Sequence, residues 1–362
     1  MVSDKLIYWF EEIGREHNDL VGKKCANLGA MTQMGLPVPP GFAISIDAYK
    51  RFIEETGIAK EIAGYVSSLG ELKDAGVARF EEIGRDTRSM IENAPMPESL
   101  NADISSYYDQ LCHRVGIDEV PVSVRSAGTA SRPGMFETYL NVKGKDEVVE
   151  RVKNVWGSAF TSRAISFRVN KGIPIDCDML GVAIPKMINA RAAGIGFTVD
   201  PISGDSSKIV IEANWGLGEG VVSGAETVDR FVVDKQRFEI IERALCKKLR
   251  QVVSKGKGAE WEDVPLKMQT VPCLSDGEIK EIAKLAKTLE EQLGEPQDME
   301  WAIDPDFPFP NNVFLLQTRP AKSAVNKPKS ASEQLADRIV SGFKRIDLSE
   351  AKDRMKGIDF RF

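Results

Sequence analysis

The alternation of apolar and polar residues along the chain predicts strands at 120–126, 181–188, 195–200, 208–213, 230–234, 298–303 and 313–319. Helical spacing of apolar residues predicts helices before Gly35, over most of 47–117, over 145–171 and from Ser275 to about Gly294. Ser275 and Glu278 have capping-box spacing at the start of the last helix. A chain of 362 residues exceeds the size at which one hydrophobic core usually keeps growing, so we expect two or more lobes.

The last two predicted strands carry the most informative pattern. Side chains alternate along a strand, so Asp298 and Glu300 share one face, and Gln317 and Arg319 share one face of the next strand. If these polar faces coincide, one surface presents two carboxylates, an amide and a guanidinium, and the reverse is wholly apolar. The expected reverse positions include Met299, Trp301, Ile303, Phe314, Leu316 and Thr318.

This polar surface has the chemistry of a site for Mg²⁺ and phosphate. Glu300 and the amide oxygen of Gln317 are the hard ligands that Mg²⁺ prefers, and Arg319 suits a phosphate oxygen. A half-solvated hairpin with a surface salt bridge explains the same pattern, because alternation is common.

Two further features could bind phosphate. Arg125 ends a predicted strand and precedes a loop of small residues, 126–134, whose backbone N–H groups could approach phosphate oxygens. Lys23 and Lys24 open a predicted helix, where cations oppose the helix dipole unless an anion neutralises them. Each feature alone also has an ordinary explanation: the loop after Arg125 could be a polar turn, and Lys23 and Lys24 could be solvated surface lysines.

Composition narrows the class of protein. Lys and Arg number 48 and Asp and Glu number 54, so the net charge of −6 argues against nonspecific nucleic-acid binding, and a phosphate site must be a local cluster of cations. The five cysteines are odd in number and form no C-x-x-C pair, which argues against a disulfide framework or a zinc site and favours a reducing cytoplasm. No apolar run approaches the roughly 20 residues that span a membrane, and residues 1–16 lack the features of a signal peptide.

Two common nucleotide-binding motifs are absent from the sequence. No G-x-x-x-x-G-K-[ST] occurs, which excludes a Walker-type loop. The glycine-rich segment 216–224 is not G-x-G-x-x-G, so a Rossmann dinucleotide site is unsupported.

Several segments, all in one order, resemble the N-terminal ATP-grasp region of the pyruvate phosphate dikinase and phosphoenolpyruvate synthase family. The segment VGKKCANLGAMTQMGLPVPPGFAIS resembles the family's G-G-K-x-A-x-L-G and G-x-P-V-P-P-G-F patterns, and VSVRSAGTASRPGMFETYLNV resembles its phosphate-binding loop. FTSRAISFR, KMINARAAGIGFTVDP and IEANWGLGEGVVSG match further segments, and QDMEWAID and LLQTRP match the closing strands. The match covers about residues 6–320.

The resemblance implies an ATP-grasp fold, an α/β architecture of two lobes that hold ATP and Mg²⁺ between them. We expect an N-terminal lobe at 1–190 with a helical insertion at about 47–117, a C-terminal lobe at 191–320 and a linker or docking tail at 321–362. Lys24, Arg125 and Arg319 would neutralise phosphate charge during catalysis, and Glu300, Gln317 and Asp298 would hold the metal. The implied nucleotide-binding residues are Lys24, Arg125, Thr129, Lys186, Met187, Glu212, Asp298, Glu300, Gln317 and Arg319.

The resemblance also implies a phosphotransferase of the dikinase type, in which a phosphoryl group passes from ATP to a histidine. The family's complete enzymes carry this histidine in a T-S-H-A-type motif of a swivelling domain, followed by a barrel for the acceptor. This chain has only His17 and His113, and neither lies in such a motif. We therefore expect an ATP-binding subunit similar to the smaller component of phenylphosphate synthase, working with a histidine-bearing partner subunit that binds a small-molecule acceptor such as phenol.

The sequence departs from the family pattern at two positions. Pro185 stands where the family usually has Gln before the Lys–Met hinge along adenine, which leaves the purine preference open, and Lys23 replaces a usual glycine. Two other functions stay open: a self-contained ATP-grasp kinase or ligase for a small molecule, and a regulatory subunit that senses ATP without chemistry. The complete set of charged residues argues against the second, because a pure sensor could lose some of them.

Overall fold

The computed structural model describes residues 5–72, 75–130, 134–176, 179–224, 227–256 and 258–321. The strands are β1 (Ile7–Trp9), β2 (Gly41–Ile44), β3 (Val122–Ala127), β4 (Thr138–Val142), β5 (Gly181–Pro185), β6 (Ala192–Phe197), β7 (Lys208–Trp215), β8 (Asp229–Asp234), β9 (Ile240–Ala244), β10 (Arg250–Ser254), β11 (Ala259–Asp263), β12 (Gln297–Ile303) and β13 (Val313–Pro320). The α-helices are α1 (Asn18–Val21), α2 (Lys23–Gln33), α3 (Ile46–Glu55), α4 (Ile58–Ser68), α5 (Val77–Asn93), α6 (Glu98–Val115), α7 (Lys145–Gly157), α8 (Ser162–Lys171), α9 (Glu219–Val222) and α10 (Asp276–Leu293). Short 3-10 turns are η1 (Phe10–Glu12), η2 (Arg15–His17), η3 (Ser158–Phe160) and η4 (Leu266–Met268).

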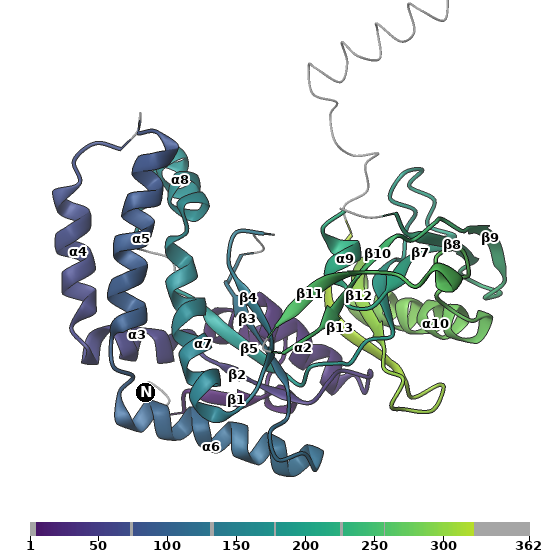
Figure 1. Cartoon of the computed structure of the whole chain (residues 1–362), viewed down its shortest axis with the longest axis horizontal. Helices are drawn as coiled ribbons and strands as arrows, with labels where there is room; N and C mark the ends of the chain where they lie inside the picture. Colours follow the sequence, from purple (N-terminus) through teal and green to yellow (C-terminus); the bar gives the residue numbers. More distant parts are fainter. Residues whose placement is uncertain are drawn as a thin grey trace, which may run out of the picture.

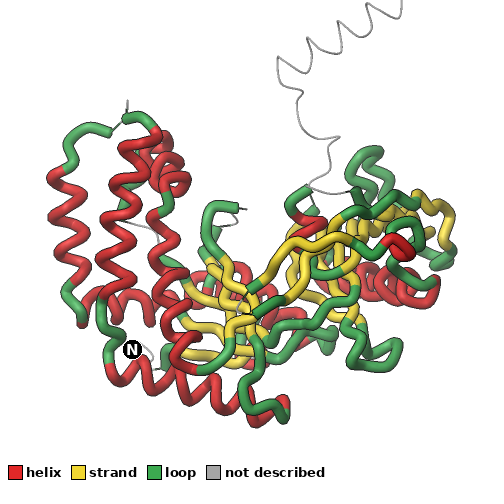
Figure 2. The backbone as a smooth tube through the Cα atoms, in the orientation of Figure 1, coloured by secondary structure: helices red, strands yellow, loops and turns green. Residues whose placement is uncertain are grey.

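Two sheets organise the molecule (Figure 1 and Figure 2). The first has the strand order β1-β2-β5-β3-β4, and the second has the order β13-β12-β6-β7-β8-β9. The strands β10 and β11 form a separate antiparallel hairpin. The mixed helices and sheets in two lobes confirm the predicted α/β fold class.

The helices α3 to α8 cover one side of the first sheet, and α4, α5 and α8 stand upright beside it in Figure 1. Their apolar faces bury large side chains, among them Trp156 of α7, which packs against Tyr49 and Phe52 of α3 with ring centroids 5.5 and 5.0 Å apart. The burial of aromatic side chains of this size is a major source of stability.

Helix α2 lies on the other side of the first sheet and joins the two lobes. Its residues Cys25, Leu28 and Met31 belong to one buried cluster that continues into the second sheet and α10. The side chain of Asn27 donates a hydrogen bond of 2.8 Å to the carbonyl of Thr318 on β13. The opening segment of the chain is therefore held directly against the closing strand.

Helix α10 begins and ends as predicted. The hydroxyl of Ser275 accepts a hydrogen bond from the N–H of Glu278, the carboxylate of Glu278 accepts one from the N–H of Ser275, and Gly294 ends the helix in the left-handed conformation. Ile279, Ile282, Ala283 and Ala286 belong to the buried cluster that α10 shares with the second sheet.

The predicted long helix over 145–171 is instead two helices, so that prediction was wrong. Thr161 has an extended backbone and its hydroxyl accepts a hydrogen bond from the N–H of Ala164, so it caps a new helix, α8. The strands β9, β10 and β11 were not predicted. Most of their side chains are exposed, so they show little of the apolar alternation that marks a half-buried strand.

The other predicted features of the chain map onto the structure as follows. The predicted helical insertion contains α3 to α6. The proposed lobe boundary near residue 190 falls between β5 and β6, and it remains a proposal. The proposed tail at 321–362 lies outside the described residues beyond Ala321.

One fully buried ion pair holds the second sheet to the segment before α10. Lys248 Nζ lies 2.7 Å from Asp229 Oδ1, and both side chains have no exposed surface. The Asp229 carboxylate also accepts hydrogen bonds from the backbone N–H groups of Cys246 and Cys273, each at 3.1 Å. The carboxylate is therefore well paired only while the lysine is present.

We expect Lys248→Met to lower the free energy of unfolding by about 3–5 kcal/mol, because it leaves a buried carboxylate without its counter-ion. The matched control is Lys247→Met, at the exposed neighbouring position. Urea denaturation of the three proteins measures the effect. Equal stability of both variants would show that backbone hydrogen bonds alone satisfy Asp229.

Candidate active site

A cleft of about 440 Å³ lies between the two sheets. Its walls come from the start of α2, the strands β3 and β4 with the loop between them, the end of β5, the segment around α9 and the paired strands β12 and β13. Segments that are far apart in the sequence therefore converge on one cavity. The predicted site residues that line it are Lys24, Arg125, Lys186, Met187, Glu300, Gln317 and Arg319.

The polar faces of β12 and β13 coincide, as predicted. The two strands are antiparallel, with Asp298 opposite Arg319 and Glu300 opposite Gln317. The Gln317 amide donates a hydrogen bond of 2.9 Å to Glu300 Oε1. Arg319 lies 2.6–2.7 Å from Asp298 Oδ2 through two of its nitrogens.

The reverse face departs from the prediction in two ways. The register of the two strands shifts between Glu300 and Trp301. Because of this bulge Leu316 lines the cleft, and Phe314 packs with Leu316 and Ala302 instead of on the reverse face, where Val313 and Leu315 lie. Thr318 stays on the reverse face, but it donates a hydrogen bond of 2.9 Å to the buried Gln297 amide oxygen. The reverse face is therefore not wholly apolar, because β12 begins with a buried amide that needs a partner.

Arg125 of β3 connects the two sheets across the cleft. One terminal nitrogen lies 3.3 Å from Glu300 Oε2, and the other donates a hydrogen bond of 3.3 Å to the carbonyl of Leu316. Its Nε is buried without a hydrogen-bond partner among the described residues. A buried unpaired guanidinium N–H is costly, so this group is well suited to donate to a bound anion.

Lys24 lies in the first turn of α2, and the structure brings that turn close to the loop after β3. Gly22 has a positive φ of +81°, and a Cβ there would lie 2.0 Å from the carbonyl oxygen of Ala127. The next residue, Lys23, donates its backbone N–H to the carbonyl of Gly128 at 2.9 Å. Only glycine allows this close approach of α2 to β3.

The Lys24 ammonium is half-buried and makes no hydrogen bond or ion pair within the described part of the chain. Burial and the nearby positive charge of Arg125 lower the pKa of Lys24 from 10.5 to about 8, although Glu300 acts in the opposite direction. A cation held in this way is strongly favoured to pair with a negatively charged ligand.

The hinge residues Lys186 and Met187 follow β5 at the other end of the cleft. The backbone N–H of Lys186 donates a hydrogen bond of 2.8 Å to the carbonyl of Pro40, and that of Met187 donates one of 2.7 Å to the carbonyl of Pro121. Lys186 Nζ lies 3.8 Å from the buried carboxylate of Asp304. The hinge is therefore fixed by the fold, and apolar residues cover the walls beside it, namely Leu140, Ile188, Ala190, Ala302 and Leu316.

Three predicted site residues do not line the cleft. Thr129 is exposed in the loop after β3. Glu212 shares the sheet face of Glu300, but Ile195 lies between them, so the carboxylates are roughly two strand spacings or 10 Å apart. Asp298 lies behind Glu300 as the partner of Arg319, and burial raises the pKa of Asp298 while Arg319 lowers it. The roles of these three residues, like those of the predicted residues that line the cleft, stay predictions.

The structure adds cleft residues that sequence reasoning had not singled out. Glu219, at the start of α9, lines the cleft, and desolvation raises its pKa while Arg125 lowers it. Phe136 and Asn27 also line the cavity. The glycine-rich segment around α9 was the available signal for Glu219, but no pattern shows which side chain of such a loop points inward.

The donor set suits Mg²⁺ together with phosphate. Glu300 and Gln317 offer a carboxylate and an amide oxygen side by side. The described residues include no group of three or more His, Cys, Asp or Glu side chains that could hold a metal alone. A magnesium ion at Glu300 and Gln317 would therefore take its remaining ligands from phosphate and water, as is usual for Mg²⁺ with nucleotides.

Residues 18–338 match the family model of the pyruvate phosphate dikinase AMP/ATP-binding domain. The chain belongs to this family. A probable phosphoenolpyruvate synthase from Staphylothermus marinus is 39% identical, and the alignment covers 98% of this chain and 45% of that protein. A phosphoenolpyruvate synthase from Aeropyrum pernix is also 39% identical, over 87% of this chain and 42% of that protein.

The chain thus spans less than half the length of these two relatives. Among solved structures, a biotin carboxylase complex from Campylobacter jejuni is 12% identical, and the match covers 85% of this chain and 42% of that chain with a TM-score of 0.34. No helix in the described ranges is long and apolar enough to cross a membrane.

The lowered pKa of Lys24 makes two pH-dependent predictions. Burial of the charged Lys24 ammonium lowers the free energy of unfolding by at most roughly 3 kcal/mol. The whole of this destabilisation is present below pH 8, where the folded protein holds the charged form, and none remains above pH 10.5, where the ammonium is neutral in the unfolded chain as well. Lys24→Met should therefore raise Tm at pH 7 and lose that advantage in alkali. Wild-type affinity for Mg-ATP should fall as the pH rises above about 8, and the variant should bind weakly at every pH.

Calorimetry and thermal melts on either side of pH 8 measure both effects, with the exposed Lys60→Met as the control. A Lys24→Met protein that binds Mg-ATP like the wild type would remove Lys24 from the site.

Proposed function

We propose that this chain binds Mg-ATP in the cleft between its sheets and donates a phosphoryl group from it, as the ATP-binding part of a dikinase-type phosphotransferase. The observation that carries the proposal is the convergence of Lys24 and Arg125, two buried or half-buried cations with unused donors, on the polar strand pair that contains Glu300. Membership of the AMP/ATP-binding family supports the same ligand.

The cleft has two chemically different ends that fit the two ends of ATP. The end beside Lys186 and Met187 is largely apolar and suits a purine ring. The end beside Lys24, Arg125 and Arg319 is cationic and suits a triphosphate. Mg²⁺ at Glu300 and Gln317 would neutralise further charge on the phosphates.

Phosphoryl transfer depends mainly on positioning and charge neutralisation. Lys24 and Arg125 would hold phosphate oxygens from the first lobe, and Arg319 would do so from the second. Asp298 would keep the Arg319 guanidinium oriented, because it binds two of its nitrogens. The side chains come from both lobes, so the geometry of transfer would depend on how the lobes are held together.

The acceptor in this proposal is a histidine on a partner domain or subunit, which passes the phosphoryl group to a small molecule such as phenol. His17 accepts a hydrogen bond from the N–H of Gly14 in a 3-10 turn, and His113 lies in the last turn of α6. Neither residue lines the cleft. The names of the relatives make pyruvate a second candidate for the final acceptor.

Glu300→Gln should slow phosphoryl transfer on the order of 10²-fold, because it removes a charged ligand where phosphate charge must be neutralised. The change is isosteric and the apolar packing of β12 on α10 should persist, so the protein should still fold, with a modest fall in Tm because Arg125 loses its charged partner. The control is Glu262→Gln on the exposed strand β11. An unchanged rate of the folded variant at saturating Mg²⁺ would show that Glu300 is not a required ligand.

This chain alone should form no stoichiometric phosphoenzyme, because its two histidines lie outside the cleft. Incubation with ATP labelled at the β or the γ position, followed by an alkaline gel, tests this. Only slow hydrolysis should be seen until a histidine-bearing partner is added, and the partner should then carry the label. A fully labelled band from this chain would favour a self-contained kinase, and ATP binding without any transfer to a partner would favour an ATP sensor.

A further inference from the structure

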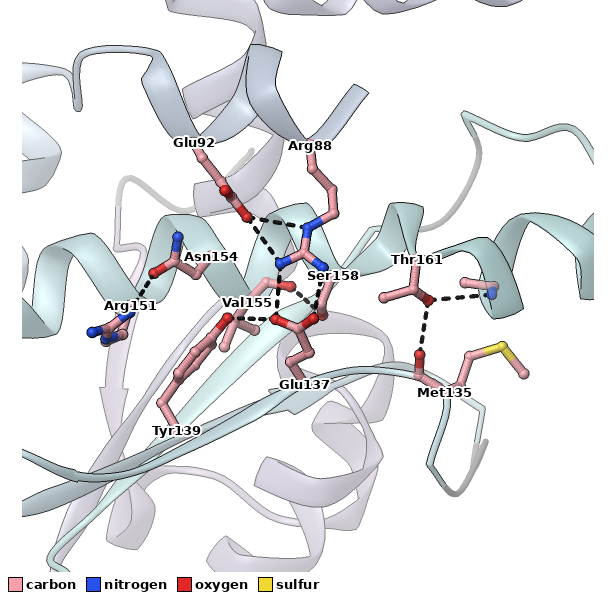
Figure 3. A network of polar contacts seen from close by, with 11 residues as sticks. Arg88, Glu92, Met135, Glu137, Tyr139, Arg151, Asn154, Val155, Ser158 and Thr161 are labelled. Atoms are coloured by element: carbon pink, nitrogen blue, oxygen red, sulfur yellow. Dashed lines mark hydrogen bonds and ion pairs between the residues drawn. The ribbon is translucent and has the colours of Figure 1, made fainter. Parts of the chain in front are cut away.

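The segment that leads from the phosphate loop into β4 has two sides. Phe136, Thr138 and Leu140 line the cleft, while the alternate residues Glu137 and Tyr139 point away from it toward the helices. Figure 3 shows this second side, where Glu137, just before β4, and Tyr139, on β4, meet Arg88 and Glu92 on α5. The loop that borders the cleft is thus attached to the helical region directly behind it.

Arg88 makes the central contact. Its two terminal nitrogens donate hydrogen bonds of 2.6 and 3.0 Å to the two carboxylate oxygens of Glu137, in the bidentate geometry that fixes both position and orientation. The guanidinium is itself held by Glu92 Oε1 at 3.1–3.2 Å. The Tyr139 hydroxyl donates a further hydrogen bond to Glu137.

This ion pair is partly shielded from water. The side chains of Arg88, Glu92 and Glu137 are 26%, 29% and 34% exposed, unlike the many exposed pairs on the helices of this protein. Gly157 of α7 makes room for it, because a Cβ at that position would lie only 3.0 Å from Glu92 Oε1. Burial and the bond to Glu137 raise the pKa of Tyr139, so its hydroxyl stays a donor.

Two more contacts join the same loop to the start of α8. The hydroxyl of Thr161 donates a hydrogen bond of 3.1 Å to the carbonyl of Met135, and Arg163 donates one to the carbonyl of Gly134. Gly134, Met135 and Glu137 are thus held in succession from the helical side. Of these three residues only Gly134 also lines the cleft.

We propose that Arg88 is a positioning residue, which acts through Glu137 to hold the segment 134–137 before β4 at the distance from Lys24 and Arg125 that the β- and γ-phosphates of ATP require. This inference rests on the proposed function. It assigns a task to the helical region, whose residues otherwise lie outside the cleft: α5 would set the phosphate end of the site without touching the nucleotide. The hydrogen bonds described for this network do not reach Met187 or Ile188, which border the adenine end, so that end should depend on it much less.

Binding of Mg-ATP and of AMP, measured by calorimetry, separates positioning from general stability. Arg88→Ala should weaken Mg-ATP binding roughly tenfold and AMP binding less than about twofold, because AMP lacks the phosphates that the loop would hold. Glu137→Ala should do the same, and the double variant should lose no more than either single one. Arg88→Lys keeps the charge but loses the bidentate geometry, so it should fall between Arg88→Ala and wild type.

Arg85→Ala is the matched control, since this arginine lies on the same helix with a side chain that is 73% exposed. The inference would be overturned if Arg88→Ala bound Mg-ATP as tightly as the wild type. It would also be overturned if the variant lost affinity for Mg-ATP and AMP equally, because that result would indicate a general structural role. If Arg88→Ala does not fold, Arg88→Lys and Glu137→Gln carry the same comparison. Failure of the wild type itself to bind Mg-ATP would instead refute the proposed function, and this inference with it.

Discussion

The contact between Arg125 and Glu300 is the constraint on which the site depends. It joins β3 of the first sheet to β12 of the second, at 3.3 Å, and it places a guanidinium and a carboxylate where the two lobes meet. Both side chains are largely shielded, at 16% and 21% exposure, so each limits the desolvation penalty of the other. The pair is nevertheless incomplete, because Arg125 Nε has no partner among the described residues. A structure that keeps such a donor unpaired is prepared for a ligand that brings negative charge.

The charges around this pair explain how an acidic protein can hold a polyphosphate. The net charge of the whole chain is −6, yet Lys23, Lys24 and Arg125 converge at one end of the cleft. The repulsion between Lys24 and Arg125 is offset by nearby carboxylates, since Glu300 favours the charged form of Lys24 and Glu219 interacts with Arg125. A bound triphosphate would take over part of that compensation and free the Glu300 carboxylate for a metal ion.

Local sequence pattern was sufficient for those parts of the site that lie within one strand or one loop. The alternation around Asp298 and Arg319 predicted the shared polar face, and the capping box predicted the start of α10. The pattern failed where the outcome depends on distant partners. The bulge that turns Leu316 into the cleft arises from pairing with β12, and no local signal marks it. The inward position of Glu219 likewise follows from the way α9 packs on β6, β7 and β10.

The difference between local pattern and distant partners also separates side chains that would contact a ligand from side chains that position those contacts. Lys24, Arg125 and Gln317 are recognisable because their chemistry suits a nucleotide, whatever surrounds them. Arg88 and Glu137 are separated by 49 residues, and their pairing exists only because α5 stands behind β4. Gly128 and Gly134, which the structure describes on either side of this loop, can adopt many backbone conformations, so contacts with other elements decide their position. The side of the loop that faces away from the cleft must therefore supply the order that binding requires, and in this protein that side is held by a half-buried ion pair and two helix-start contacts.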